Sequence, residues 1–163
     1  MEPLIALLLV TAAVLAAGRR RPALARPTVA LRAGIAAMFL LSGVAHFVGM
    51  RAELVAMVPD ALPAPELLVT ATGVLEIAAA LAMASARWAP YAAAGLSLLL
   101  VAMFPANVHL ALTGTDLPWW DHLLPRTVMQ LVFLAATTSV AVAGLRRLGS
   151  ERHGAALAPP PRP

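Results

Sequence analysis

Residues 66 to 85 read ELLVTATGVLEIAAALAMAS, a run of apolar and small side chains whose charges are Glu66 at its start and Glu76 in its middle. A transmembrane helix needs about 20 such residues to cross roughly 30 Å of hydrocarbon. This stretch therefore predicts a membrane span that carries a carboxyl group at mid-depth.

Three further stretches have the same length and character. They are residues 28–49, 88–113 and 123–145. The whole chain of 163 residues is 61% apolar and 12% charged, against about 45–50% and about 25% in a typical soluble domain. A single water-soluble domain is excluded, and we expect an all-α protein whose core is an integral membrane four-helix bundle.

A shorter apolar run, residues 3–18, precedes these spans. Its length also suits the apolar region of a signal peptide. The chain starts without basic residues, however, and Arg19, Arg20 and Arg21 follow the run, where they would oppose translocation. We therefore expect one additional N-terminal transmembrane helix that is retained.

The expected organisation has four parts. Residues 1–18 form the N-terminal transmembrane helix, residues 19–27 a basic cytoplasmic linker, and residues 28–145 the four-helix membrane core. Residues 146–163 end in APPPRP, a proline-rich segment that cannot bury apolar area, and are expected to be a disordered cytoplasmic tail.

Arginine positions predict the orientation. All positive side chains are arginine, and five crossings that start outside put most of them on one side: Arg19, Arg20, Arg21, Arg26, Arg32, Arg87, Arg146, Arg147 and Arg152. The other side holds Arg51 and Arg126. Because cytoplasmic connections carry the excess of basic residues, the N-terminus is expected outside and the C-terminus in the cytoplasm. The abundance of Arg, Ala and Pro suits a GC-rich bacterial genome, so the expected location is a bacterial plasma membrane.

Glu76 is the strongest candidate for function. A carboxylate at mid-membrane costs about 2.5–3.5 kcal/mol, so it needs partners, a wet cavity or a proton. His46 lies near the outer end of its span, with Ser42 one turn below on the same face. We assign Glu76 and His46 as the catalytic candidates, although His46 is also near enough to the interface to be simply solvated.

Four more polar residues belong to the outer half of the predicted bundle and are assigned as substrate-binding candidates: Asn107, His109, Arg126 and Gln130. Arg126 and Gln130 share one helix face, and either is expected to reach toward Glu76. Pro105 is expected to kink its helix and leave a polar notch. Asn107 and Gln130 suit hydrogen bonding between helices equally well.

Metal binding and nucleic-acid binding are not expected. The chain has no cysteine and no pair of histidines four residues apart, so it lacks the usual ligand spacing for a metal ion. Its arginines lie between apolar runs, whereas a nucleic-acid binder gathers them on one exposed face.

Five segments, taken in order, resemble the DoxX family of small membrane proteins: SGVAHF (42–47), MVPDALPAP (57–65), TGVLEIAAAL (72–81), MFPANVHLAL (103–112) and PRTVMQ (125–130). The resemblance covers residues 30 to 145. It implies a four-helix membrane core and points to His46, Glu76, Asn107, Arg126 and Gln130 as the positions of the family's polar motifs. Members are similar to the small subunit of an archaeal thiosulfate:quinone oxidoreductase, to a mycobacterial partner in a membrane redox complex and to an animal receptor-assembly chaperone.

Three functions remain open from the sequence. The first is binding of a quinone or another lipophilic small molecule in the outer half of the bundle, with Glu76 in proton transfer and a membrane or redox protein as partner. The second is a stand-alone membrane isomerase, cyclase or epoxide-opening enzyme that uses the acid–base chemistry of Glu76 and His46. The third is a non-enzymatic assembly factor or accessory subunit. No cofactor beyond the quinone is expected.

Overall fold

The computed structural model of this chain describes residues 1–156, and every regular element in that range is a helix. In chain order the helices are α1 (Glu2–Gly18), η1 (Pro22–Leu24), α2 (Pro27–Ala45), α3 (Arg51–Ala56), α4 (Pro65–Ala82), α5 (Ala89–Thr113), η2 (Trp119–Asp121) and α6 (Leu123–Ala156). Four of them, α2, α4, α5 and α6, are long and apolar enough to cross a membrane, and α1 is apolar but shorter, at 17 residues. The all-α prediction is confirmed, as is the number of long apolar helices.

Proline residues stand at the beginning of most long helices. Pro27 and Pro65 are the first residues of α2 and α4, and Pro3 and Pro90 are the second residues of α1 and α5. Proline suits the first turn because its fixed φ matches the helix and the N–H that it lacks has no acceptor there. The sequence therefore sets where each of these helices starts.

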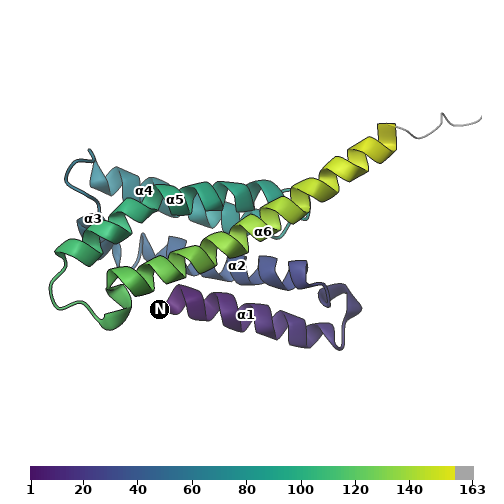
Figure 1. The fold of residues 1–163 in the computed structure, drawn as a ribbon, viewed down its shortest axis with the longest axis horizontal. Helices are drawn as coiled ribbons and strands as arrows, with labels where there is room; N and C mark the ends of the chain where they lie inside the picture. The colour runs from purple at the N-terminus through teal and green to yellow at the C-terminus, as the bar shows by residue number, and fades with distance from the viewer. Residues whose placement is uncertain (157–163) are drawn as a thin grey trace, which may run out of the picture.

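The long helices alternate in direction and pack mainly against their neighbours in sequence. α1 packs along α2, α2 along α4 and α5 along α6, while α4 also contacts α5 and α2 contacts α6 (Figure 1). Helices α2, α4, α5 and α6 therefore close a bundle of four, and α1 lies against α2.

The bundle has two chemically different ends. The arginine end holds the start of α2, the end of α4 and the start of α5, with Arg32 and Arg87. The histidine end holds the end of α2, the start of α4, the end of α5 and the start of α6, with His46 directly after α2. In Figure 1 the histidine end is on the left, and α6 extends past the arginine end at upper right.

Glycines bring neighbouring helices close together. A Cβ atom at Gly73 would lie 2.6 Å from His46 Cβ, and one at Gly43 would lie 2.8 Å from Ile77 Cγ1. At Gly34 a Cβ atom would collide with the Thr11 hydroxyl of α1. Small residues let helix backbones approach in this way, so α2 packs tightly against α4 on one side and α1 on the other.

The buried apolar core lies toward the arginine end. Its members include Ile35, Met38, Phe39, Ala80, Met83, Ala89, Ala93, Leu96, Leu100, Ala136, Val140 and Ala141. No residue of α5 after Leu100 is buried, and none of α6 before Gln130 is buried. The half of the α5–α6 pair nearer the histidine end is therefore less filled than the other half.

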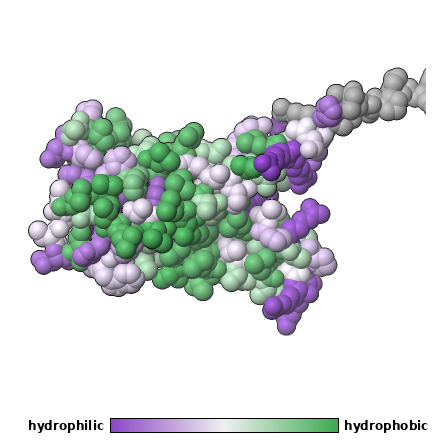
Figure 2. All heavy atoms as spheres, in the orientation of Figure 1, coloured by the Kyte–Doolittle hydropathy of each residue, from purple (hydrophilic) through white to green (hydrophobic). Residues whose placement is uncertain are grey.

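Large apolar side chains also cover the outside of the molecule. Leu98 is 74% exposed and Leu131 60% exposed, and both lie within long helices. Figure 2 shows apolar surface over most of the middle and polar surface gathered toward the two ends. This is the pattern of helices that face an apolar surrounding.

The chain termini differ in part from expectation. The prediction of a disordered tail over residues 146–163 is wrong for its first part, because α6 continues as helix to Ala156. Hydropathy falls after Leu145, but the Arg, Leu and Glu residues that follow are good helix formers. The rest of the tail, residues 157–163, lies outside the described residues. The linker 19–27 contains the short helix η1.

Candidate functional site

Glu76 and His46 face each other between α4 and the end of α2. Glu76 Oε2 lies 4.0 Å from His46 Nδ1, and each side chain is 3% exposed. The carboxyl is therefore buried inside the protein and does not face the surroundings of the molecule. A buried carboxyl without a partner is costly, so the imidazole beside it is the group that makes its burial tolerable.

The backbone of α2 fixes the orientation of the His46 ring. Nδ1 lies 2.9 Å from the carbonyl oxygen of Ser42, one turn earlier. A carbonyl oxygen only accepts hydrogen bonds, so Nδ1 carries the proton in this contact. Nε2 is then left to accept a proton, and the neutral ring becomes a cation when it does.

Helix spacing brings these groups together. Ser42 and His46 share one face of α2, and Gly73 and Glu76 share one face of α4. Gly43 and Gly73 let the two faces meet, and a Cβ atom at Gly43 would lie 3.1 Å from Glu76 Cβ. Larger residues at either glycine would separate Glu76 from His46.

Glu76 and His46 lie side by side without a hydrogen bond between them, because the 4.0 Å from Oε2 to Nδ1 is longer than a hydrogen bond. Glu76 Oε2 has no hydrogen-bond partner among the described residues. The carboxyl therefore keeps a free position at which it can donate or accept a hydrogen bond.

Arg126 belongs to a second polar cluster, between α5 and α6 at the histidine end. It donates from Nη1 to Asn107 Oδ1 and from Nη2 to Asp121 Oδ1, the latter at 2.8 Å. Its Nε is buried and has no partner among the described residues. The expectation that Arg126 reaches toward Glu76 is therefore wrong, because Asp121, five residues earlier, binds the guanidinium.

Asp121 is a site residue that the sequence analysis did not single out, although it pairs with Arg126. It ends the short helix η2, which brings the chain back to the start of α6. Asp121 stands just before α6, and Arg126 lies in the first turn of that helix. An acid and a base at this spacing are the sequence signal that predicts such a pair.

Gln130 also has a different partner from the expected one. Its Nε2 donates to the carbonyl oxygen of Leu100 on α5 at 2.7 Å. Pro105 has no N–H for the carbonyl of Val101, four residues earlier, and its ring crowds that turn, so Leu100 lies directly before the carbonyl that proline leaves without a helix donor. Gln130 therefore joins α6 to α5 at the proline turn, which is the interhelical role that the sequence left open for it.

A groove of about 160 Å³ runs beside this contact. Val101, Phe104, Thr127, Gln130, Leu131 and Leu134 line it. Glu76 and His46 do not line it. The groove lies in the less filled half of the α5–α6 pair, and its lining is apolar except for Thr127 and Gln130.

His109 and Arg51 also lie at the histidine end. The side chain of His109 is half-buried, and it makes no hydrogen bond within the described residues. Arg51, which the sequence did not single out for the site, donates to the backbone oxygen of His46 at 3.2 Å and to Thr70 Oγ1 at 3.1 Å. It ties α3 to α2 and α4 directly beside the His46–Glu76 pair.

The structure thus separates the candidates into two clusters. Glu76 and His46 form one, Asn107 and Arg126 the other, and no hydrogen bond or ion pair joins the two within residues 1–156. In the same range no group of three His, Cys, Asp or Glu side chains could hold a metal ion.

Residues 35–141 match the model of a protein family described as a domain of unknown function, DUF8561. The match covers more than half of the chain, which therefore belongs to this family. All six candidate residues lie inside the matched range, whereas α1 and the last turns of α6 lie outside it. No curated protein and no solved structure matches the chain.

Proposed function

We propose that this protein is a DoxX-like multi-pass membrane protein that binds a quinone or similar lipophilic molecule at the histidine end and uses Glu76 in proton transfer. Helices α2, α4, α5 and α6 form the membrane bundle, and α1 is an additional span. The N-terminus lies outside and the C-terminus in the cytoplasm of a bacterial cell. The arginines gathered at one end of the bundle support this orientation.

The buried Glu76 carboxyl is the single observation that carries the proposal. It is 2% exposed, and its Oε2 has no hydrogen-bond partner among the described residues. Insertion scales make a carboxyl in the middle of a span expensive, and such groups usually serve proton or ligand pathways. A role limited to helix packing would be met at lower cost by an amide or a hydroxyl.

The second cluster supplies the part of the site that orients a ligand. Reduction of a quinone to a quinol consumes two electrons and two protons, and the ring oxygens become hydroxyl groups. Arg126 and Asn107 hold one oxygen by hydrogen bonds. Both protons come from water at the histidine end: one goes to the oxygen held by Arg126 and Asn107, and the other passes through His46 and Glu76 to the second oxygen. The electrons come from a membrane redox protein that docks with this chain.

Packing supports entry of the ligand at the histidine end. Between Leu100 and the end of α5, and between the start of α6 and Gln130, no residue is buried. A ligand can therefore enter between α5 and α6 with little loss of existing core contacts, and the apolar groove there suits a ring or an isoprenoid chain.

A pair of variants on α4 tests the proposal. Glu76→Gln keeps the shape of the side chain and removes its acidity, whereas Glu66→Gln makes the same chemical change at an exposed position of the same helix. Purified protein of each kind is analysed by native mass spectrometry for bound quinone and then assayed for quinone reduction in membranes with an electron donor. We expect Glu76→Gln to retain quinone and lose turnover, and Glu66→Gln to behave as wild type.

The same experiment separates the other two functions. Conversion of a lipid-extract component without an electron donor would indicate an acid–base enzyme instead of a redox component. Loss of a co-purifying protein in Glu76→Ala, with no small molecule bound in wild type, would indicate an assembly factor. Unchanged turnover in Glu76→Gln overturns the proposal.

A further inference from the structure

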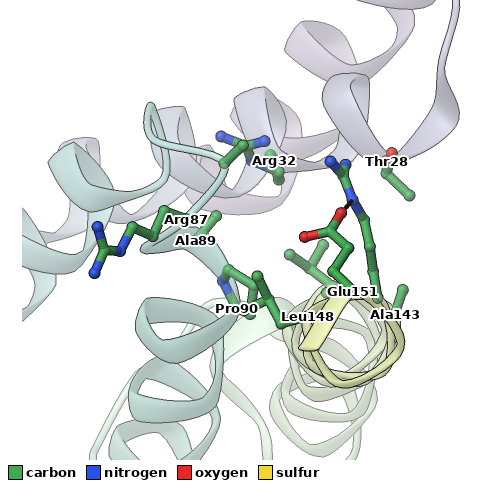
Figure 3. A pocket seen from close by; sticks show the side chains of 12 residues that line it. Thr28, Arg32, Arg87, Ala89, Pro90, Ala143, Leu148 and Glu151 are labelled. Atoms are coloured by element: carbon green, nitrogen blue, oxygen red, sulfur yellow. Dashed lines mark hydrogen bonds and ion pairs between the residues drawn. The ribbon is translucent and has the colours of Figure 1, made fainter. Parts of the chain in front are cut away.

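The arginine end contains a cavity of about 550 Å³, remote in the fold from the histidine end. The start of α2, the start of α5 and the last turns of α6 enclose it (Figure 3). In that view Arg32 and Glu151 lie on opposite sides of the gap, with Pro90 and Leu148 close together below them. None of the six candidate residues of the histidine end lines this cavity.

The charges around the cavity are mainly positive. Arg32, Arg87 and Arg147 line it together with one acid, Glu151. Arg147 Nε donates to Glu151 Oε1 at 2.7 Å, so this pair is neutral. Within the described residues neither Arg32 nor Arg87 has a carboxylate partner. Two positive charges are therefore left without a counter-charge at this end.

These two arginines are held in place by other contacts. Arg32 Nε donates to the carbonyl oxygen of Met83 at 3.0 Å, which ties α2 to the end of α4. The Arg87 guanidinium lies 5.7 Å from the ring centre of Trp88. Positioned guanidinium groups lose less freedom on binding an anion than free ones do.

The cavity is charged at one end and apolar along its length. From Glu151 to Val140 the α6 residues that line it cover about 16 Å of helix axis. Val140, Ala143 and Leu148 on α6 and Ala89 and Pro90 on α5 form the apolar wall. A free inorganic anion would gain nothing from contact with this apolar wall. A phospholipid can place its phosphate among the charges and its acyl chain along the wall.

We propose that this cavity binds an anionic phospholipid, with its phosphate between Arg32 and Arg147 and the start of an acyl chain along Val140, Ala143 and Pro90, whereas the Arg87 side chain points away from the gap and adds only to the positive charge of this end (Figure 3). Basic pockets between helices at the cytoplasmic face recognise lipid headgroups in this way. The inference rests on the proposed membrane location but not on a quinone at the histidine end. The Arg147–Glu151 pair weakens the binding of the lipid, because Glu151 competes with the phosphate for Arg147.

Charge variants on one turn of α6 test this site. Arg147→Gln removes a lining charge, Glu151→Gln releases Arg147 from its partner, and Arg146→Gln removes an exposed charge at the neighbouring position that does not line the cavity. The full chain in nonionic detergent is titrated with phosphatidylglycerol, phosphatidylcholine or inorganic phosphate. Lipid retained in native mass spectrometry and the midpoint of thermal unfolding report binding.

We expect wild type to retain phosphatidylglycerol over phosphatidylcholine. The apparent Kd should rise about fivefold in Arg147→Gln and fall by a similar factor in Glu151→Gln, from the usual contribution of one basic residue at a lipid surface. Arg146→Gln should leave it unchanged. Equal losses in Arg146→Gln and Arg147→Gln would show a diffuse charge effect and overturn the site. Equal stabilisation by inorganic phosphate would overturn the lipid as its occupant.

The expected changes in phosphatidylglycerol binding do not depend on whether the histidine end binds a quinone. Glu76→Gln should retain phosphatidylglycerol as wild type does, because Glu76 lies outside the cavity. The two proposals can therefore fail independently.

Discussion

Glu76 meets His46 beside the contact between Gly43 and Gly73, with 4.0 Å between Oε2 and Nδ1. A carboxyl and an imidazole are thus buried together where two helix backbones come close. The same contact makes both the stability of the α2–α4 pair and the proposed chemistry depend on a few small residues.

Removal of the His46 ring should destabilise the protein. In His46→Ala the Ser42 carbonyl loses the donor at Nδ1, and Glu76 stays buried with no ionisable neighbour in ion-pair range among the described residues. A buried polar group left without its partner costs about 1–3 kcal/mol. Denaturant titration in detergent, followed by circular dichroism, measures the free energy of unfolding. His109→Ala is the control, and its half-buried ring without a hydrogen bond predicts a change within about 0.5 kcal/mol. Equal losses in the two variants would contradict the assigned role of His46.

Glycine-to-alanine changes should have opposite effects at two positions. A Cβ atom at Gly73 would lie 2.6 Å from His46 Cβ, so Gly73→Ala forces α2 and α4 apart and should cost about 1–3 kcal/mol. Gly95 in α5 has open space around it, and Gly95→Ala should stabilise the helix by about 0.5–1 kcal/mol. Thermal unfolding of both variants in the same detergent checks the difference. A neutral Gly73→Ala would mean that the two helices do not approach this closely.

Asp121 should contribute more to the stability of the protein than Asp116, the other aspartate between α5 and α6. Asp121→Asn removes the negative partner of Arg126 and should lower stability by about 1 kcal/mol, because the pair is only partly exposed, at 16% and 24%. Asp116→Asn is the control, since Asp116 is exposed and its φ of 53° is a conformation that asparagine tolerates. High salt should weaken wild type more than Asp121→Asn, and a salt response that is the same in both would argue against the pair.

Gln130 and Pro105 should be coupled. Gln130→Leu leaves the Leu100 carbonyl without its donor and should cost about 1–3 kcal/mol. Pro105→Ala restores the N–H that bonds the Val101 carbonyl and makes the turn beside Leu100 regular, so in that background the same change should cost less. A double-mutant cycle of unfolding free energies measures the difference, which should be at least about 0.5 kcal/mol. Additive effects would show that the amide contact is independent of the proline turn.

Hydropathy predicted the long helices well because their composition differs so strongly from that of the connections. The expected span 88–113 corresponds to α5 (Ala89–Thr113), and the expected span 66–85 to α4 (Pro65–Ala82). The end of α2 was predicted too late, at residue 49. The helix ends at Ala45, and Gly49, with a φ of 84°, lies in the turn that follows. Because the residues of this turn are mostly apolar, the hydropathy does not fall where the helix ends.

The candidate site was predictable within one helix but not between helices. Spacing of four residues placed Ser42 below His46 on α2, and the backbone hydrogen bond between them follows from it. Which side chain faces Glu76 depends on the rotation of each helix about its axis, and sequence spacing does not report this rotation. For that reason the sequence offered Arg126 and Gln130 as neighbours that could reach Glu76, with a packing role left open for Gln130, whereas Asp121 and the Leu100 carbonyl are their partners.

Helix α6 is a single helix from Leu123 to Ala156 and extends beyond the bundle (Figure 1). It carries Arg126 near one end and Arg147 near the other, about 32 Å apart along its axis. A stiff rod that spans this distance acts as a lever, so a tilt that opens a gap beside Arg126 must also swing Arg147 relative to the start of α5. Binding at the proposed site beside Arg126 would thereby change the proposed site beside Arg147 through movement of one helix, without rearrangement of the core.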